Sequence, residues 1–335
     1  MKNLNRFLRQ WYDSSERLLV HTSGSTGTPK DIWVEKAKMR ASALRTCQFL
    51  GLKPRDRALL CLPLDYIAGK MMVVRAMVCH LQLISVPPSS RPLEKLAVKS
   101  GENVAIDFTA MVPMQVYASL QDPAQKELLK KIRHLIIGGS GVDTALESQL
   151  RNFPGAVWST YGMTETLSHI AMRRISGEKA SSWYEPLDNV NIALTSEHCL
   201  RIEAPDVADS PIVTNDIAEL DSDGRRFRIL GRKDNVICSG AIKIQIEEVE
   251  KRLSPVVQGD FAITKCPHPV LGECVVMLTI SSNLDEAKTW CERLLPRYWI
   301  PKYYFQVSAI PLTPTGKIAR KDAADLALRE MMKGK

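Results

Sequence analysis

The sequence lacks the features that mark a membrane-spanning or secreted protein. No apolar run approaches the roughly 18 residues that a membrane helix needs. The opening stretch, MKNLNRFLRQWYDSSERLLV, is too polar for a secretory signal peptide. None of the eight cysteines forms a CxxC pair, which disfavours a structural zinc site, and many stand in apolar stretches such as ALLCLPL. Such cysteines are typical of small buried hydrophobes in a reducing compartment, so we expect a cytoplasmic protein.

The charge pattern also lacks the mark of a nucleic-acid-binding protein. The chain carries 45 lysines and arginines against 37 acidic residues, a formal net charge of +8. Its basic residues are dispersed, with no long basic run and no basic–aromatic stripe. The excess of positive charge therefore indicates anionic small substrates at least as well as nucleic acid, and we expect no nucleic-acid partner.

Common nucleotide-binding and hydrolase signatures are missing as well. There is no GxGxxG and no GxSxG, which removes the simplest dinucleotide-binding and α/β-hydrolase interpretations. The segment HTSGSTGTPK (21–30) has glycines, hydroxyls and a lysine, but Pro29 precedes Lys30 and Asp31 follows it. A Walker A loop needs glycine before the lysine and serine or threonine after it, so a P-loop nucleotidase is disfavoured.

The same segment nevertheless has the chemistry of a phosphate-binding loop. Its glycines let the backbone approach an anion, its hydroxyls supply hydrogen-bond donors, and its lysine supplies positive charge. Taken alone, the segment is also consistent with a flexible Ser/Thr/Gly turn. The candidate phosphate-binding residues are Thr22, Ser23, Gly24, Ser25, Thr26, Gly27, Thr28 and Lys30.

The first 234 residues alternate β-type runs with helical patterns. Amphipathic helices are predicted at residues 36–50 and 122–132, the second with Asp122 as N-cap before Pro123. Strands that alternate with helices predict βαβ units and a mostly parallel sheet. The buried strands are predicted at RALLCLPL (57–64), HLQLISVP (80–87), NVAIDF (103–108) and HLIIGG (134–139).

After about residue 188 the pattern changes to close-spaced strands around the turn DSDG (221–224), which predicts antiparallel pairing. From residue 235 onward we predict a smaller α+β unit, with a helix at IEEVEKRL, three strands and a terminal helix after Gly316. The expected fold is therefore α/β, with a large N-terminal domain (1–234) that includes a β-rich subregion. A small C-terminal domain (235–335) follows it.

Three further segments carry a family resemblance together with the phosphate loop. They are STYGMTET (159–166), TNDIAELDSDGRRFRILGRKDNVICSG (214–240) and PLTPTGKIARK (311–321). In this order the chain resembles the adenylate-forming superfamily of acyl-CoA synthetases, peptide-synthetase adenylation domains and luciferases. The resemblance covers most of residues 19–321. It implies an enzyme that joins a carboxylic acid to AMP, releases pyrophosphate and passes the acyl group to a thiol, with ATP, Mg²⁺ and coenzyme A as partners.

The resemblance assigns the nucleotide site residue by residue. The loop Thr22–Lys30 matches the family's loop around the leaving pyrophosphate. Tyr161 matches the residue that stacks on adenine, Thr164 a contact to the α-phosphate, and Glu165 a magnesium ligand, a hard oxygen for a hard cation. Gly138 and Gly139 in IIGGSG lie where the family places backbone beside the adenine.

The later motifs supply the ribose site, the hinge and the catalytic lysine. Asp216 matches the acid that accepts hydrogen bonds from the ribose hydroxyls, and Arg232 matches a second nucleotide contact. Asp234 falls on the hinge about which the family's mobile C-terminal domain swings, although a turn-capping aspartate is the alternative. Lys317 resembles the lysine that bridges the substrate carboxylate and the nucleotide, because a cation offsets the repulsion between these two anions.

The segment CSGAIKIQIEEVE (238–250) matches the family's channel for the thiol. Ser239 and Gly240 are the candidate channel residues. The family usually has a second glycine and a later proline here, whereas this chain has Ala241 and Ile246. These two positions weaken the match for this segment.

The identity of the carboxylic acid substrate is indicated by a narrower resemblance. TYGMTETLSHIAMRRI is similar to the o-succinylbenzoate–CoA ligases of the menaquinone pathway. LPLDYIAGKMMVVRAMV (62–78) occupies the segment of the acid pocket, but Asp65 and Tyr66 replace the usual histidine or aromatic. Because o-succinylbenzoate has a second carboxylate that needs a partner when buried, Lys70, Arg75 and His169 are the candidate acid-binding residues. The alternatives are surface positions for both cations, another acyl- or aryl-CoA synthetase, and a non-catalytic acyl-adenylate binder.

Overall fold

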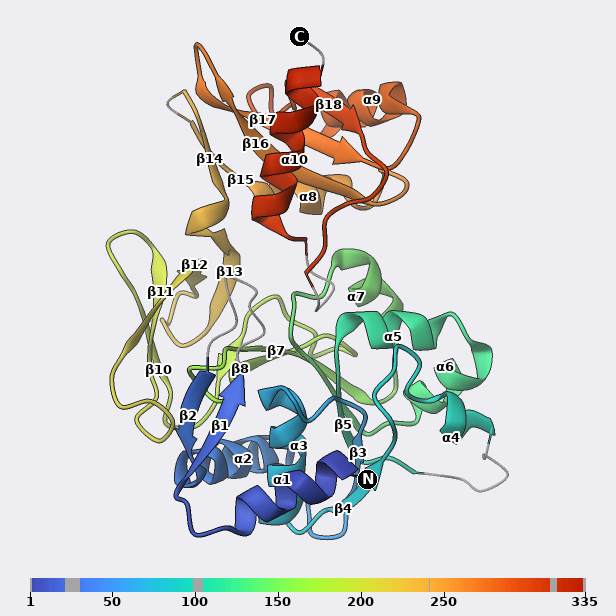
Figure 1. Cartoon of the computed structure of the whole chain (residues 1–335), viewed down its shortest axis with the longest axis vertical. Helices are drawn as coiled ribbons and strands as arrows, with labels where there is room; N and C mark the ends of the chain where they lie inside the picture. Colours follow the sequence, from blue (N-terminus) through green and yellow to red (C-terminus); the bar gives the residue numbers. More distant parts are fainter. Residues whose placement is uncertain (1, 22–30, 99–104, 241, 314–317, 334–335) are drawn as a thin grey trace.

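The protein is a mixed α/β molecule drawn out along one axis (Figure 1). The computed structural model describes residues 2–21, 31–98, 105–240, 242–313 and 318–333. No helix in these ranges combines the length and the apolar character needed to cross a bilayer.

A seven-stranded sheet organises the larger body, in the order β4-β3-β5-β6-β7-β8-β9. The strands from β4 to β7 are parallel, and β8 and β9 continue the sheet antiparallel, so the prediction of a mostly parallel sheet is confirmed. Its strands are β3 (Arg57–Leu60), β4 (Gln82–Ser85), β5 (Phe108–Met111), β6 (His134–Ile137), β7 (Ala156–Gly162), β8 (His169–Arg174) and β9 (Glu185–Pro186).

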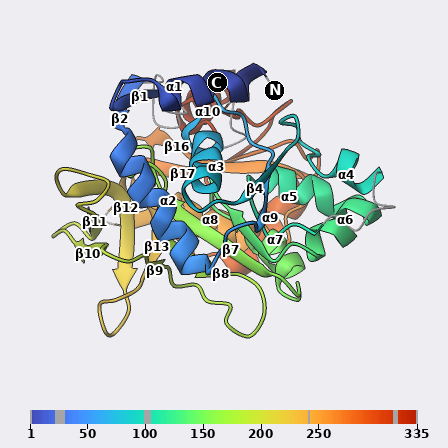
Figure 2. The ribbon, with the colours of Figure 1, turned by 90° about the horizontal axis from the view of Figure 1, so that it is seen from below.

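Helices cover both faces of this sheet because its strands are apolar on both sides. Ala58 and Leu60 pack into one core cluster, and the alternate residues Leu59 and Cys61 pack into the other. Figures 1 and 2 show α2 and α3 on one face and α5 and α6 on the other. The helices of this body are α1 (Lys2–Tyr12), α2 (Lys36–Leu50), α3 (Ile67–Val78), α4 (Glu94–Val98), α5 (Pro113–Leu120), α6 (Pro123–Lys130) and α7 (Thr144–Leu150).

Two antiparallel units complete this body. One is the pair β1 (Arg17–His21) and β2 (Asp31–Glu35). The other is a four-stranded sheet in which β12 and β13 meet at the predicted turn, where Gly224 adopts a positive φ of 68° and its amide donates to Asp221 O at 3.0 Å. The strands of this second unit are β10 (Asn191–Leu194), β11 (Cys199–Glu203), β12 (Ile212–Leu220) and β13 (Phe227–Arg232).

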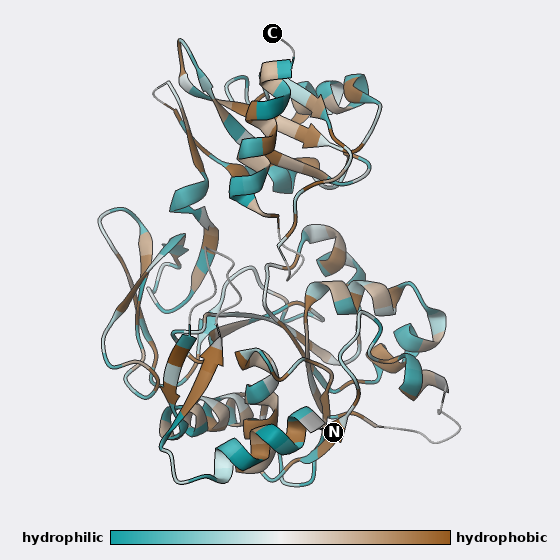
Figure 3. Ribbon diagram, in the orientation of Figure 1, coloured by the Kyte–Doolittle hydropathy of each residue, from teal (hydrophilic) through white to brown (hydrophobic). Residues whose placement is uncertain are grey.

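The remaining residues form the upper body of Figure 1, a five-stranded sheet covered by helices. Its buried side chains, from Ile237 to Ala327, form core clusters separate from those of the larger body. In Figure 3 brown apolar residues concentrate on the strands and teal polar residues on the outer helices. The elements are η1 (Lys233–Asn235), β14 (Val236–Ser239), β15 (Ile242–Gln245), α8 (Ile246–Leu253), β16 (Phe261–His268), β17 (Gly272–Thr279), α9 (Leu284–Leu294), β18 (Tyr303–Gln306) and α10 (Arg320–Lys333).

Two sequence predictions need correction. Of the strand expected at 103–108, residues 103–104 lie outside the described residues, and β5 begins only at Phe108, where pairing with Ala58 of β3 starts. The structure also joins Cys47 and Cys79 by a disulfide, whereas the sequence indicated reduced thiols. The two lie near the ends of α2 and α3, which pack side by side, a proximity that 32 residues of separation do not reveal.

Candidate active site

Polar residues gather where the parallel strands end, the edge at which open α/β sheets bind ligands. Gly138 follows β6, and its amide donates to Met111 O at 3.1 Å. A Cβ on Gly138 would lie 2.5 Å from Thr160 Oγ1 on the neighbouring strand β7. Gly139 has a positive φ of 86°, which side chains rarely adopt. Both positions therefore favour glycine, and at this edge Gly139 is exposed while Gly138 is half-buried.

Tyr161, near the end of β7, connects this edge to the β-rich region. Its ring packs against Tyr184 and Phe227, with centroid distances of 5.9 and 5.1 Å. Its hydroxyl donates to Asp216 Oδ2 at 2.5 Å. Burial, and then the charge of Asp216, raises the pKa of Tyr161, so the phenol keeps its proton and remains a donor.

Asp216 is held from a second side by Arg232. These residues lie opposite each other on β12 and β13, and Arg232 Nη1 donates to Asp216 Oδ1 at 3.2 Å. Arg232 Nη2 donates to Asp234 Oδ2 at 3.0 Å, and Asn215 Nδ2 donates to the same oxygen at 3.1 Å. The structure thus brings Tyr161, Asp216, Arg232 and Asp234, from three distant segments, into one network.

The loop between β7 and β8 presents Thr164 and Glu165. Thr166 Oγ1 organises this loop: it accepts from the Met163 amide at 3.0 Å and donates to Ser168 O at 2.7 Å. Thr164 is half-buried and Glu165 is exposed. The fixed loop therefore leaves the Glu165 carboxylate open to solvent at the same edge of the sheet.

A buried chain of hydrogen bonds begins in the same loop and ends on α2. Arg75 Nη2 on α3 donates to Ser168 Oγ at 2.6 Å, and Ser168 Oγ lies 3.3 Å from His169 Nδ1. His169 Nε2 lies 3.0 Å from Thr46 Oγ1, which donates to Ser42 O at 3.1 Å. Since Arg75 only donates and the Thr46 proton is already committed, His169 accepts at Nδ1 and donates from Nε2.

Arg75 is the unusual member of this chain. It is 2% exposed, its Nε has no hydrogen-bond partner, and it forms no ion pair with any carboxylate that the structure describes. Burial lowers its pKa to about 9, and burial, followed by the charges of Arg75 and Arg45, holds the pKa of His169 well below its ordinary value. A buried guanidinium without a counter-ion is costly, so this site is suited to an anion brought by a ligand.

Lys70, also on α3, has a different environment. Its Nζ donates to Leu19 O on β1 at 3.2 Å. Burial lowers the pKa of Lys70, while Asp65 opposes and Arg6 adds to this shift. Lys70 and Arg75 are both buried, so neither occupies the surface position that was the alternative for these cations.

Known proteins resemble this chain in sequence and in fold. A family model described as AMP-binding enzyme matches residues 14–207. The chain belongs to the AMP-binding enzyme family. This confirms the resemblance on which the site residues were assigned.

Three relatives of this AMP-binding enzyme are named as acyl-CoA synthetases or acid–CoA ligases. A solved acyl-CoA synthetase (AMP-forming)/AMP-acid ligase II-like protein from Dyadobacter fermentans is 33% identical, with a TM-score of 0.65, and the match covers 96% of this chain and 92% of that one. A 2-succinylbenzoate–CoA ligase of Bacillus subtilis is 26% identical over 94% of this chain and 70% of its own length. An o-succinylbenzoate coenzyme A synthetase from Bacillus subtilis, solved with ATP and magnesium ion, has a TM-score of 0.76 at 23% identity, covers 91% and 69%, and shows the shared fold. These relatives confirm the predicted class, an AMP-forming acid–CoA ligase.

Several predicted site residues of this AMP-binding enzyme lie outside the described residues. Their flanks are described: His21 pairs with Asp31, and Leu312 pairs with Ile318. The predicted residues concerned are Thr22, Ser23, Gly24, Ser25, Thr26, Gly27, Thr28, Lys30 and Lys317.

The predicted thiol-channel residues belong to the upper body. Ser239 is buried at the end of β14, where it pairs with Ile242 and Gly272. Gly240 has a φ of 63°, and its amide donates to Leu271 O at 2.7 Å. In Figure 1, β14 and β15 stand above β12 and β13, away from β7.

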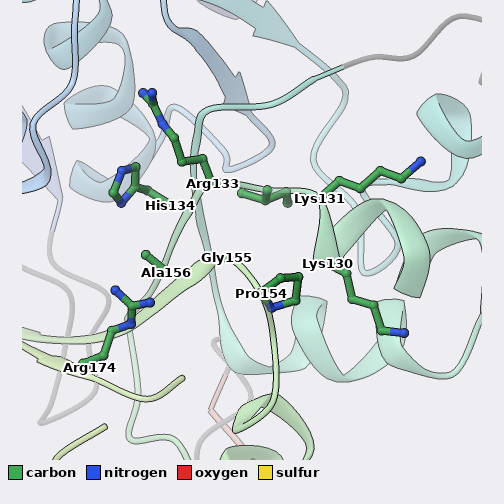
Figure 4. A pocket seen from close by; sticks show the side chains of 9 residues that line it. Lys130, Lys131, Arg133, His134, Pro154, Gly155, Ala156 and Arg174 are labelled. Atoms are coloured by element: carbon green, nitrogen blue, oxygen red, sulfur yellow. The ribbon is translucent and has the colours of Figure 1, made fainter. Parts of the chain in front are cut away.

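The cavity of Figure 4, about 570 Å³, lies at the opposite edge of the seven-stranded sheet. His134 and Ala156 are the first residues of β6 and β7, whereas the candidate site lies where these strands end. Lys130 pairs with Glu127, and Arg133 pairs with Asp56. Figure 4 shows the two lysines pointing away from Arg133 and His134, so the cavity has no converging set of charges and is not the candidate active site. It is lined by Lys130, Lys131, Ile132, Arg133, His134, Pro154, Gly155, Ala156 and Arg174.

The hydrogen-bond chain around Arg75 includes two residues, Ser168 and Thr46, to which the sequence assigned no role. The signal for Thr46 is weak: it is a hydroxyl on the buried face of a predicted helix, where such residues commonly bond to their own backbone.

Proposed function

We propose that this chain adenylates o-succinylbenzoate with ATP and transfers the acyl group to coenzyme A, the ligase step of menaquinone biosynthesis. The observation that carries this choice is Arg75, a fully buried guanidinium without a carboxylate partner among the described residues. The names of the 2-succinylbenzoate–CoA ligases that match this chain support the same substrate.

The dicarboxylate explains why a lone buried cation is tolerated. One carboxylate of o-succinylbenzoate reacts with ATP, and the other lies beside Arg75 in this proposal, because a buried carboxylate needs a charged partner. Arg75 presents a free Nε, and its Nη2 is already fixed by Ser168. The second carboxylate completes the ion pair, with His169 holding Ser168 and thereby the guanidinium in place. A monocarboxylic acid would leave Arg75 buried and unpaired.

The chemistry at the other carboxylate has two steps. A carboxylate oxygen forms a bond to the α-phosphorus while the bond to pyrophosphate breaks. The thiol sulfur of coenzyme A then bonds to the acyl carbon, its proton passes to solvent, and AMP leaves. In the first step Lys317 offsets the repulsion between the two anions, and the loop Thr22–Lys30 holds the leaving pyrophosphate.

Asp216 and Tyr161 position the nucleotide in this scheme. Tyr161 and Arg232 hold the two oxygens of Asp216, each of which has a second lone pair for a ribose hydroxyl. The backbone at Gly138 and Gly139 lies beside the adenine, as the family pattern implies.

Magnesium fits this site as a companion of ATP. Among the residues that the structure describes, no group of three or more His, Cys, Asp or Glu side chains could hold a metal ion. Glu165 offers one exposed carboxylate. Mg²⁺ is commonly held by one or two carboxylates together with substrate phosphates, and it supplies charge neutralisation on the phosphates.

A screen of carboxylic acids for ATP-dependent pyrophosphate release tests the proposal. We expect o-succinylbenzoate to give a kcat/KM at least tenfold above that of benzoate, fatty acids and 4-oxo-4-phenylbutanoate, which lacks the aromatic carboxylate. A higher kcat/KM for a monocarboxylic acid would replace the proposed substrate with that acid. Binding of acyl-adenylate without any pyrophosphate release would instead indicate a non-catalytic binder.

A further inference from the structure

The base of the segment that carries Lys317 is fixed by an ion pair. Arg320, the first residue of α10, donates from Nη1 and Nη2 to the two carboxylate oxygens of Glu250 on α8, each at 2.6 Å. Such two-point pairing fixes direction as well as distance. The side chains are only 27% and 17% exposed, so solvent screens this pair less than a surface pair.

The same pair also holds the neighbouring strand. Glu250 Oε1 accepts from the Ile263 amide at 2.9 Å, and Arg320 Nη1 donates to Ile263 O at 3.2 Å. The pair therefore joins three elements, α8, β16 and α10, at one point. Removing Glu250 would take this acceptor from the Ile263 amide, and removing Arg320 would take this donor from the Ile263 carbonyl.

The residues just before Arg320 close a short antiparallel connection. Leu312 pairs with Ile318, and the Ala319 amide donates to Pro311 O at 2.9 Å. Arg320 is the next residue after Ala319, and its ion pair with Glu250 fastens this end of the connection to α8. Lys317 stands one residue before Ile318 in the sequence.

The other end of α8 is fastened to the predicted hinge. Gln245, which precedes α8, donates from Nε2 to Arg232 O at 2.9 Å and to Glu247 at 2.6 Å. Glu247 also accepts from Asn235 Nδ2, in η1. Helix α8 thus contacts the hinge segment at its start and the base of the lysine segment in its middle.

We propose that Glu250 and Arg320 are positioning residues for adenylation, because the pair fixes Ile318–Arg320, the described residues that follow Lys317 in the sequence, to α8. This inference rests on the proposed adenylating function, because Lys317 acts in that step. A cation must sit within a fraction of an ångström of its working position to stabilise the crowded transition state. Loosening its base therefore slows adenylation and spares the thiol-transfer step, in which Lys317 has no role.

Three variants separate this role from simple stability. Glu250→Gln keeps an acceptor for the Ile263 amide but removes the charge, and Arg320→Lys keeps the charge but removes the two-point geometry. The matched control is Asp285→Asn, which breaks the exposed pair with Lys288 at 3.0 Å on α9, outside the segment 238–250.

Two measurements on the full-length protein test the inference. One is hydrogen exchange at the amides of Ile318 and Ala319. The other is the pair of half-reactions, pyrophosphate release and thioester formation from supplied acyl-adenylate and coenzyme A. We expect Glu250→Gln and Arg320→Lys to speed exchange and to lower the adenylation kcat at least tenfold, with KM for ATP and the thioester rate within about twofold. The control should change neither.

Each contrary outcome has a definite meaning. Unchanged exchange in both pair variants would overturn the proposed fastening, whatever the enzyme does. Faster exchange with unchanged adenylation, or with equal losses in both half-reactions, would overturn the positioning role. A wild-type protein that releases no pyrophosphate with any acid would refute the proposed function, and the exchange result would still decide the fastening.

Discussion

Replacing Arg75 with methionine should separate the two substrate carboxylates. The variant keeps much of the side-chain volume but removes the only cation that contacts Ser168 among the described residues. A hydrogen bond to a charged group contributes about 1.5–3 kcal/mol. The loss of kcat/KM for o-succinylbenzoate should therefore reach roughly 10- to 150-fold, at about 1.4 kcal/mol per factor of ten. For 4-oxo-4-phenylbutanoate the loss should stay below about threefold, because that acid makes no such bond.

The free energy of unfolding of Arg75→Met tests, without substrate, whether Arg75 has a partner in the folded chain. Arg75 is buried without a counter-ion, and replacing such a charge with an apolar side chain is often neutral or stabilising. We therefore expect Arg75→Met to unfold at the same or a higher denaturant concentration than the wild type. The matched control is Arg45→Met, since Arg45 is 5% exposed but is paired with Asp206 at 3.0 Å. That variant should lose about 1–2 kcal/mol of stability, because Asp206 is partly exposed, and should affect both acids equally.

The assay is continuous detection of pyrophosphate with each acid, combined with urea unfolding of each variant. Equal losses of kcat/KM for the dicarboxylic and monocarboxylic acids would refute the role of Arg75. A large loss of stability in Arg75→Met would show that a partner for the guanidinium exists within the folded chain.

Three other perturbations have definite expectations. Lys317→Ala should slow adenylation by roughly a hundredfold while sparing thioester formation from supplied acyl-adenylate, and loss of both half-reactions in quenched-flow assays would contradict the two-step assignment. Asp234→Pro should slow thioester formation and spare adenylation, because proline fixes φ at the predicted hinge. Asp234→Ala removes only the carboxylate bonded to Arg232 and Asn215, and it should retain fast coenzyme A transfer. His169 has a folded-state pKa well below its ordinary value, so the unfolded chain binds a proton that the folded chain does not, and stability is lost as pH falls below about 6.5. Urea unfolding at about pH 7.5 and about pH 5.5 should show about 1 kcal/mol more loss in wild type than in His169→Asn; equal losses would assign the effect elsewhere.

Much of the fold follows from local pattern. The helix predicted at residues 36–50 is α2, where Met39, Ala43, Cys47 and Leu50 are buried at helical spacing, and the helix predicted at IEEVEKRL is α8, which is amphipathic. Asp122 caps α6 as predicted, accepting from the amides of Ala124 and Gln125. The strand near residue 108 was misplaced because strand limits are set by pairing with a neighbour, which the local pattern does not contain.

The site was less accessible from the sequence. The contacts of Asp216 with Tyr161 and with Arg232 join residues 55 and 16 positions apart, and the family resemblance named these residues without indicating their mutual contacts. Nothing in the sequence indicates that Ser168 accepts a hydrogen bond from Arg75, or that Lys70 donates to Leu19 O. Such contacts depend on the packing of α3 against the β7–β8 loop and β1. The predicted domain boundary at residue 234 and the roles of the site residues remain predictions.

The most direct measurement incubates the protein with ATP, Mg²⁺, coenzyme A and o-succinylbenzoate and follows the products by mass spectrometry. The proposed function predicts an o-succinylbenzoyl–coenzyme A thioester that forms only when ATP is present, with one AMP and one pyrophosphate released per thioester. Absence of both the thioester and the acyl-adenylate, under conditions in which another carboxylic acid is converted, would contradict it.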